Sequence, residues 1–514
     1  MFRRLLSVGG YTAISRITGF GRDIMMAIIL GAGPMSDAFL VAFRLPNNFR
    51  SIFAEGAFNL AFLPRYAALR AQESDAKATH FADRVFSWQI VFQLVLLVVA
   101  LAGMGWIIRA MAPGFAAHPG QTELATDLAR ITFPYLILTV VAVQLSAMLN
   151  AHDKFSAAAA WSIFLNVAMM ATLAAWRLFP SAAYAAAWGV FFAGLLQLVF
   201  IVWAAARSGL RLHISWPRWT PEIRTFLIAL GAATFGSASV QISLFVDNLI
   251  ASFLPSGDLT ALYYADRINQ LPTGLFAIAL ATVLLPEMST RLAKGDRDGA
   301  DDAQNRSAAL ALLLTLPFVA AYFAVPLVIM RGFFAHGAFH LAAALVSAHA
   351  LMAYGVGLPA FVLLRIVQPT FYARGDTATP VRATIVSVVF NIAIKFLLVW
   401  GFHFGAVGIA LGTSLASWLN VAVLLWLAQS RDLIRVHTNF MRSLAPTFLA
   451  AAATGGFALA GATLMQKLLH PGLLQDEAML AAAILAGGAA YGAVAMIFRG
   501  ALPLGRLSGV EARS

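Results

Sequence analysis

The sequence predicts an all-α membrane protein that crosses the bilayer about fourteen times. Only 11% of its 514 residues are charged, whereas about a quarter are charged in a typical soluble domain. The mean hydropathy is +0.80, and apolar stretches of about 20 residues, long enough to span a bilayer as a helix, recur along the whole chain. They lack the short alternating pattern of a transmembrane β-barrel, so they predict helices.

Fourteen apolar segments follow one another along the chain. The first begins with MFRRLLSVGG, which has the basic start of a signal peptide but no small-residue cleavage site after it, so we expect a retained first helix. The segments are 5–31, 34–64, 85–110, 122–149, 156–177, 184–206, 222–254, 259–286, 306–330, 340–366, 380–401, 405–428, 443–467 and 476–498. The polar loops near 65–84, 207–221 and 287–305 are the longest between them.

The basic residues predict the orientation of the chain. Most of the 35 Lys and Arg fall in one set of alternate loops and in the two tails. By the positive-inside rule, both termini then lie in the cytoplasm. We interpret the net charge of +12 as a result of topology and of contact with lipid headgroups, not as a nucleic-acid-binding surface.

Related sequence patterns recur at a spacing of 222–225 residues. FNLAFLPRYAALRA and LATVLLPEMSTRLA place Pro64 and Pro286 at equivalent positions, and LNVAMM and FNIAIK do the same for Asn166 and Asn391. A repeat of six helices inserts both copies in the same direction. The expected organisation is a six-helix bundle at 1–210, a second at 211–435, and two additional helices with a basic tail at 436–514.

Several classes of chemistry lack their usual residues in this sequence. There is no cysteine, no Gly-Lys dipeptide for a phosphate-binding P-loop and no H-E-x-x-H zinc motif. His336 and His340 have a spacing that could hold a metal ion, but no carboxylate lies near them in the sequence. A membrane-embedded transferase stays open, although it would normally need acidic or histidine clusters on a substantial loop. We expect no cofactor.

Ten charged residues are predicted to lie within the membrane, where each charge costs at least about 2.5–3.5 kcal/mol. They belong to the first, second, seventh and eighth segments, which the repeat makes equivalent pairs. The basic members are Arg16, Arg22, Arg44, Arg50 and Arg267, and the acidic members are Asp23, Asp37, Glu55, Asp247 and Asp266.

These charges allow two interpretations. Five bases and five acids could pair as internal salt bridges, although a bridge buried for stability alone often does no better than apolar packing. Alternatively, the arginines line a water-filled cavity for an anionic substrate, because a guanidinium contacts phosphate through two hydrogen bonds. Glycines and prolines in the first two segments, including Gly19, Gly21 and Pro46, favour helices that bend around a cavity.

Four stretches resemble the MurJ (MviN) family of bacterial lipid II flippases: SRITGFGRD, SDAFLVAFRLPNNFRSIFAEGAFN, YYADRINQLPTGLFAIALATVLLP and FYARGDTATP. The family belongs to a superfamily that includes multidrug antiporters and polysaccharide-unit flippases. The resemblance implies translocation of lipid II, the undecaprenyl-pyrophosphate-linked peptidoglycan precursor, across the bacterial inner membrane by alternating access. It also implies contact with membrane lipids and with the machinery of cell-wall synthesis, and a groove for the lipid tail in the last two helices.

The resemblance assigns roles to the intramembrane charges. Arg16, Arg22, Arg50 and Arg267 fall on substrate-binding positions, and Arg44 on a position where bulk positive charge suffices. Asp37 and Glu55 are expected to act as gating partners, and Asp23 and Asp266 to orient arginines or share in gating. Some relatives bind sodium, for which Asp247 and Asp376 are the candidates here, although Asp376 could instead cap a helix. Sodium, protons or the membrane potential would supply the energy.

Three alternatives remain open at this stage. A flippase for another undecaprenyl-linked saccharide shares the anionic anchor. An ion-coupled multidrug antiporter of the same superfamily would favour acidic and aromatic residues over unpaired arginines in its cavity. A membrane-embedded transferase or a structural scaffold would have no need of the arginines for translocation.

Overall fold

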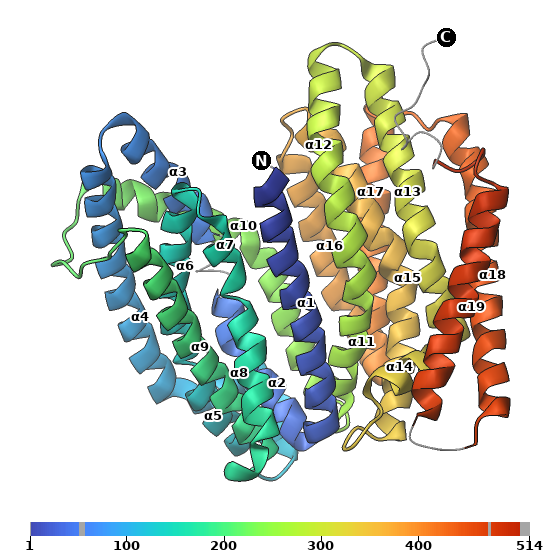
Figure 1. Cartoon of the computed structure of the whole chain (residues 1–514), viewed down its shortest axis with the longest axis horizontal. Helices are drawn as coiled ribbons and strands as arrows, with labels where there is room; N and C mark the ends of the chain where they lie inside the picture. Colours follow the sequence, from blue (N-terminus) through green and yellow to red (C-terminus); the bar gives the residue numbers. More distant parts are fainter. Residues whose placement is uncertain (1, 51–56, 471–473, 504–514) are drawn as a thin grey trace. The chain divides into compact units, whose positions relative to one another are not determined.

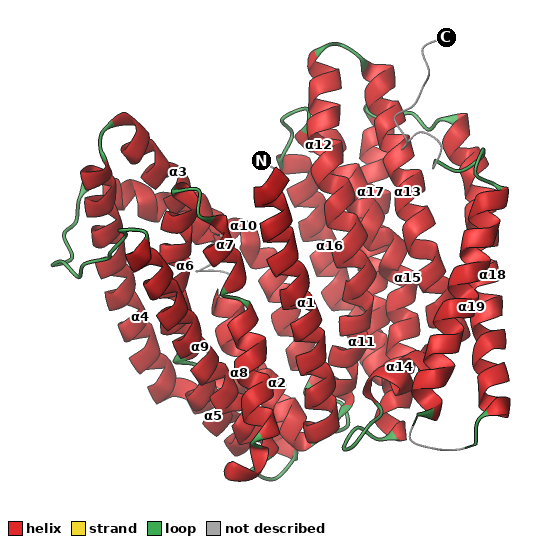
Figure 2. Cartoon of the chain, in the orientation of Figure 1, coloured by secondary structure: helices red, strands yellow, loops and turns green. Residues whose placement is uncertain are grey.

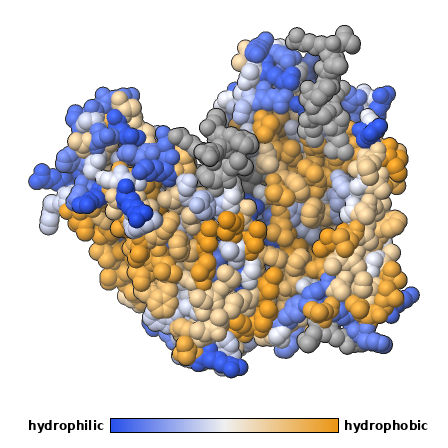
Figure 3. Space-filling model, viewed as in Figure 1, coloured by the Kyte–Doolittle hydropathy of each residue, from blue (hydrophilic) through white to orange (hydrophobic). Residues whose placement is uncertain are grey.

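The structure is a computed structural model that describes residues 2–50, 57–470 and 474–503. Every regular element in these ranges is a helix (Figure 2). Apolar side chains cover the middle of the helices on the face shown in Figure 3, and hydrophilic residues gather at the helix ends. The predicted all-α membrane fold is confirmed.

The first compact unit comprises residues Met1–Thr260. In it, α1 packs on α8, α2 on α5, α6 on α9, and α10 on α3 and α4. Its helices are α1 (Phe2–Leu30), α2 (Pro34–Arg50), α3 (Ala57–Gln72), α4 (Asp75–Met111), α5 (Gln121–Thr132), α6 (Tyr135–Ala151), α7 (Phe155–Ala160), α8 (Ile163–Ala174), α9 (Ala182–Arg207) and α10 (Pro221–Ala251) (Figure 1).

The second compact unit comprises Ala261–Ser514. In it, α15 packs on α17, α13 on α15 and α18, and α14 on α15 and α19. Its helices are α11 (Asp258–Pro272), which begins at the end of the first unit, α12 (Ile278–Ala293), α13 (Arg297–Ala324), α14 (Pro326–Phe334), α15 (Leu341–Tyr372), α16 (Ala378–Phe396), α17 (Gly405–Ser430), α18 (Thr438–Leu468) and α19 (Gln475–Ile497). The α10 helix packs within the first unit. The predicted division into bundles at 1–210 and 211–435 with two additional helices stays a prediction.

Eleven helical segments of the described chain are long and apolar enough to cross a membrane. They coincide with eleven of the fourteen predicted segments. The other three are 5–31, where α1 carries intramembrane charge, 34–64, which includes the undescribed residues 51–56, and 222–254. The chain is a multi-pass membrane protein, and the count of fourteen spans stays a prediction.

Two of the three predicted long loops are mostly helical. The α3 and α4 helices leave only a short turn at Glu73 and Ser74, where the Ser74 side chain accepts a hydrogen bond from the Lys77 amide at 3.2 Å. The α12 and α13 helices are joined similarly, and Asp296 caps α13 by accepting from the Gly299 amide at 2.9 Å. Side-chain caps of this kind satisfy the first free amides of a helix, so polar composition there marked helix ends and not loops.

Equivalent contacts recur in the two units. In the first, the Gln144 side chain donates to the Ala82 carbonyl at 2.8 Å. In the second, the Gln304 side chain donates to the Ile366 carbonyl at 3.4 Å. Each contact joins residues 62 apart, and positions 82 and 144 correspond to 304 and 366 at the offset of 222 residues seen in the sequence. The helices of the two units therefore meet at corresponding positions.

Candidate functional site

A buried ion pair and an amide fix α1 against α8. Arg22 and Asp23 are 7% and 3% exposed, and the Arg22 guanidinium donates to Asp23 Oδ1 at 2.7 and 3.1 Å and to Asn166 Oδ1 at 3.2 Å. The Asn166 Nδ2 group donates to the Ser15 carbonyl at 2.9 Å. A Cβ at Gly19 would lie in ordinary van der Waals contact with Asn166 Nδ2, at 3.4 Å, so the two helices pack closely at this position. The α1 helix runs unbroken through Gly19 and Gly21.

Arg16 lies in a different environment from Arg22. The two residues are six positions apart, which places them about 120° from each other around the helix axis. Arg16 is exposed, and in the described part of the chain no hydrogen bond or ion pair joins it to another side chain. Its charge is therefore available to a ligand or to water, whereas the charge of Arg22 is balanced by Asp23.

The two arginines of α2 contact amide side chains. Arg44 donates from NH1 to Asn248 Oδ1 on α10, and Arg50 donates from NH2 to Asn47 Oδ1 at 2.9 Å. Both arginines are half-buried. The predicted gating residue Glu55 lies outside the described residues.

Asp37 is 2% exposed and binds the segment that begins α11. Its carboxylate accepts hydrogen bonds from the Gly257 amide at 2.6 Å, the Thr260 amide at 3.0 Å and the Thr260 hydroxyl at 2.6 Å. Gly257 has φ +96°, and a Cβ there would lie 3.2 Å from the backbone of Ala32. In the described ranges Asp37 thus accepts from a helix N-terminus and not from an arginine. Its predicted gating role stays a prediction.

Asp266 and Arg267 lie together on α11. The Arg267 guanidinium donates to Gln270 Oε1 at 3.2 Å and lies 4.5 Å from the ring centre of Tyr263, while the Gln270 amide donates to Asp266. Gln270 therefore links the two charged side chains, and the orienting or gating role of Asp266 stays a prediction. Directly after this helix, Thr273–Ala277 form a π-helical turn, a feature that is frequent at functional sites.

The two candidate sodium ligands lie in separate units. Asp376 accepts from the Thr379 amide at 2.9 Å and the Thr379 hydroxyl at 2.6 Å, and so caps α16. It also pairs with Arg431 at 3.2 Å. Hydrogen bonds from Thr379, followed by the charge of Arg431, lower the pKa of Asp376. Within the described ranges no three His, Asp or Glu side chains form a group that could hold a metal ion, and the sodium site stays a prediction.

The sequence did not predict the burial of Lys395 or the contacts of Arg331 and His336 with the start of α19. Lys395 on α16 is fully buried. A lysine within the predicted apolar span 380–401 was a sign in the sequence that this side chain faces the protein interior. His336 lies 2.9 Å from Glu477 on α19, beside an Arg331–Asp476 pair at 2.9 Å. The acidic partners of α14 come from a helix about 140 residues away, which the local sequence cannot indicate.

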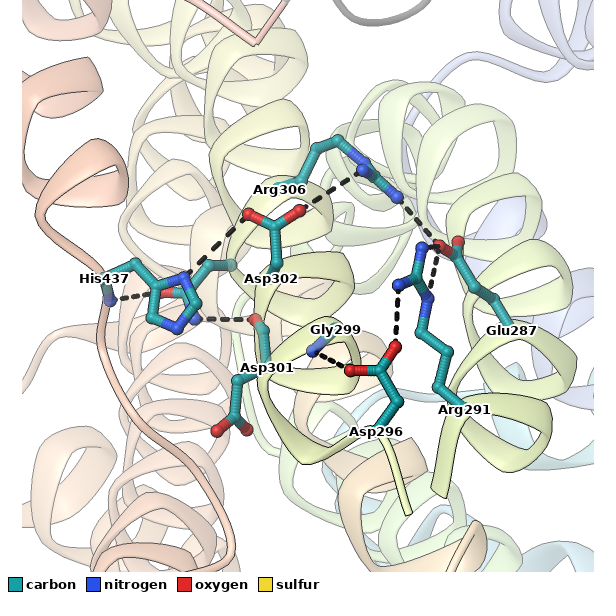
Figure 4. Close-up of polar contacts among 9 residues, drawn as sticks. Glu287, Arg291, Asp296, Gly299, Asp301, Asp302, Arg306 and His437 are labelled. Carbon is teal, nitrogen blue, oxygen red and sulfur yellow. Dashed lines mark hydrogen bonds and ion pairs between the residues drawn. The ribbon is translucent and has the colours of Figure 1, made fainter. Parts of the chain in front are cut away.

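Arg291 on α12 and Arg306 on α13 form ion pairs with neighbouring acids (Figure 4). Glu287 accepts from Arg291 at 3.0 Å and from Arg306 at 2.9 Å. Arg291 also contacts Asp296 at 3.2 Å, and Arg306 contacts Asp302 at 3.5 Å. These two arginines of the predicted basic face are thus partly neutralised within the protein.

An apolar cavity of about 280 Å³ lies among α11, α13, α14, α18 and α19 of the second unit. Its wall includes Tyr322, Phe333, Thr454, Leu480 and Gly488. The Tyr322 hydroxyl is turned to the Ile268 carbonyl at 3.1 Å. Because its lining is almost wholly hydrocarbon, the cavity suits an alkyl or isoprenoid chain.

Comparison with known proteins identifies the family. Residues 26–481 match the family described as "Lipid II flippase MurJ". A probable lipid II flippase MurJ of Rhizobium tropici is 37% identical over 509 residues, which cover 97% of this chain and 95% of that protein.

Two solved structures show the same fold. A lipid II flippase MurJ in an inward closed conformation has a TM-score of 0.77 and 23% identity, covering 96% of this chain and 99% of that one. An inward-facing multidrug resistance MATE transporter of the MOP superfamily has a TM-score of 0.67 and 17% identity, covering 81% and 94%. The sequence matches, which extend over most of the chain, show that it belongs to the MurJ family of lipid II flippases.

Proposed function

We propose that this protein translocates lipid II from the cytoplasmic to the periplasmic leaflet of the bacterial inner membrane, with both termini in the cytoplasm. The observation that carries the proposal is the family match over residues 26–481, with relatives that bear this name. An undecaprenyl-linked pyrophosphate combines a doubly anionic group with a long apolar chain. The intramembrane arginines offer positive charge for the anionic group, and the apolar cavity of the second unit suits a hydrocarbon chain.

Arginines at different depths would bind the anionic group. Arg16 on α1, Arg50 on α2 and Arg267 on α11 each have a side chain that is exposed or half-buried. Arg22 is committed to Asp23 and Asn166, so it would position α1, with weaker direct contact to the substrate. Arg44 would add positive charge.

Alternating access is the transport mechanism that we propose. A substrate changes the conformational equilibrium only if it binds one state more tightly than the other. A pyrophosphate that bridges arginines would offset their mutual repulsion and so favour the closed cavity. Without an ATP-binding loop, the membrane potential, sodium or protons would drive the cycle, since one charge crossing the potential contributes roughly 2.3 kcal/mol per 100 mV.

Replacement of three arginines tests this function. We expect Arg16→Ala, Arg50→Ala and Arg267→Ala each to cause accumulation of lipid II in the inner leaflet of cells depleted of their own flippase. If replacement of the same arginines by Lys also causes lipid II to accumulate, the planar guanidinium is needed and not only its charge. Arg109→Ala is the control. Arg109 is exposed in the last turn of α4 and is not one of the predicted intramembrane charges, so this variant should support growth.

The readouts are growth, membrane level of each variant and surface exposure of lipid II. Full growth of all three Ala variants at normal levels would contradict the proposal. Normal lipid II exposure with a defect in another undecaprenyl-linked saccharide would assign that substrate instead. Transport of cationic drugs by the wild type would favour a multidrug antiporter.

A further inference from the structure

The segment between α9 and α10 is extended and held against α4. The His213 amide donates to Asp83 Oδ1 at 2.8 Å, and the Ser215 amide donates to Ser87 Oγ at 2.9 Å. Further along, the Trp88 indole donates to the Arg218 carbonyl at 3.2 Å. These bonds fix the backbone of the segment along one side of the helix, where its loop is visible beside α4 in Figure 1.

This attachment leaves apolar and basic side chains exposed. Ile214 is 76% exposed, Trp216 83% and Trp219 63%, and Arg211 and Arg218 are also exposed. In an extended chain, alternate residues point to the same side, so Ile214, Trp216 and Arg218 share a face. Arg211 and Trp219 belong to the other set of alternate residues and are exposed as well. Among the described residues, neither Arg211 nor Arg218 forms an ion pair, so their positive charge is not compensated locally.

The level of the segment along α4 indicates what it contacts. Its three attachment points on α4 are Asp83, Ser87 and Trp88, where the charged start of the helix gives way to its long apolar stretch. Beyond them, α4 presents exposed apolar side chains such as Val95 and Val98, which are 58% and 66% exposed. The segment is therefore continuous with a lipid-facing surface and lies at the depth of the headgroups, where tryptophan is favoured.

We propose that the segment Arg211–Trp219 binds the headgroups of anionic phospholipids, with Trp216 and Ile214 inserted between neighbouring lipids. The two arginines, which seven residues of extended chain separate by roughly 23 Å, supply positive charge at two points along the segment. Anionic headgroups match this charge, whereas a zwitterionic headgroup has no net charge. The site is separate from the transported substrate. It would bind resident lipids at the edge of the first unit. The proposal does not depend on lipid II being the transported substrate.

Native mass spectrometry of the full-length protein, titrated with phosphatidylglycerol or phosphatidylcholine in detergent, tests the site. We expect the wild type to retain phosphatidylglycerol preferentially. The R211Q/R218Q variant should lose this preference by about 5-fold for each arginine removed. Trp216→Ala should weaken retention of both lipids, since it removes apolar contact and no charge.

Trp106→Ala is the matched control. Trp106 is 76% exposed and lies beside Arg109 at the other end of α4, so its loss should leave the retention of both lipids unchanged. All of these side chains are exposed, and we expect equal melting temperatures. If the double variant cannot be purified, Arg211→Gln and Arg218→Gln carry the test singly.

Unchanged lipid preference in folded arginine variants would overturn the proposal. So would a Trp216→Ala variant that alters self-association, measured by light scattering, without altering lipid retention, because the occupant would then be a second copy of the chain. An equal loss of lipid retention in Trp106→Ala and Trp216→Ala would also overturn it, since retention would then depend on any exposed tryptophan.

Discussion

At Asp37, hydrogen bonds replace the hydration that a carboxylate loses on burial. Three donors from Gly257 and Thr260 contact it, and these donors would remain buried and unsatisfied without it. We therefore expect Asp37→Ala to lower the free energy of unfolding by about 2–4 kcal/mol. The measurement is the melting temperature in detergent by fluorescence-detected size-exclusion chromatography.

Thr260→Val is the control for this prediction. It removes only the hydroxyl donor and should cost less than Asp37→Ala. An Asp37→Ala variant that melts with the wild type but fails to transport would contradict the capping role and would favour gating by Asp37.

Gly412 makes room for the buried Lys395. A Cβ at position 412 would lie 2.5 Å from Lys395 Cγ, so we expect Gly412→Ala to displace the lysine and destabilise the protein by about 1–3 kcal/mol. Gly456→Ala is the matched control, because a Cβ there meets no atom within 4 Å. That control should be neutral or slightly stabilising. Equal melting temperatures for both variants would show that Lys395 can move without cost.

At the scale of the element, the carboxylate that caps α16 makes the stability of the protein depend on pH. Thr379 and Arg431 lower the pKa of Asp376 below its usual value of 3.8. The ionised form is therefore favoured in the folded state, and the stability it contributes is present above about pH 4 and lost as the pH falls through the lowered pKa. We expect the melting temperature of Asp376→Asn to fall below that of the wild type at pH 6, with the difference shrinking toward pH 3. A difference that is constant with pH would contradict this.

The sequence predicted the helices better than it predicted which side chains contact one another. Apolar length identified eleven of the spans now seen, because the bilayer thickness imposes that length. Helix ends were less predictable, since Ser74 and Asp296 act as caps within stretches that resembled loops. The first π-helical turn, Thr273–Ala277, also had no signature beyond Pro272.

The site was predicted as a set of charges but not as a set of contacts. Arg22 and Asp23 are adjacent, so their pairing was within reach of the sequence. The contacts of Asp37 with Thr260 and of Arg44 with Asn248 join residues more than 200 positions apart. Such partners depend on how helices pack, which composition and periodicity do not specify.

At the scale of the whole molecule, flipping requires that the lipid tail stay in an apolar environment while the headgroup crosses. The cavity lined by α11, α13, α14, α18 and α19 is the apolar space that the second unit offers to such a tail. Its size of about 280 Å³ suits only part of a long isoprenoid, so the remainder would lie in the bilayer. Occupation of this cavity should therefore matter more for long tails than for short ones.

A substitution that fills the cavity tests whether part of the lipid tail lies in it. Gly488 lines it, and a Cβ at position 488 meets no atom within 4 Å, so Gly488→Leu should fold and occupy the space. Gly492→Leu is the matched control, because a Cβ there is equally free and position 492 does not line the cavity. We expect Gly488→Leu to slow translocation of full-length lipid II in proteoliposomes several-fold while sparing an analogue with a short tail, and Gly492→Leu to affect neither. An equal effect of the two variants, or an equal loss for both tail lengths, would show that the tail does not enter this cavity.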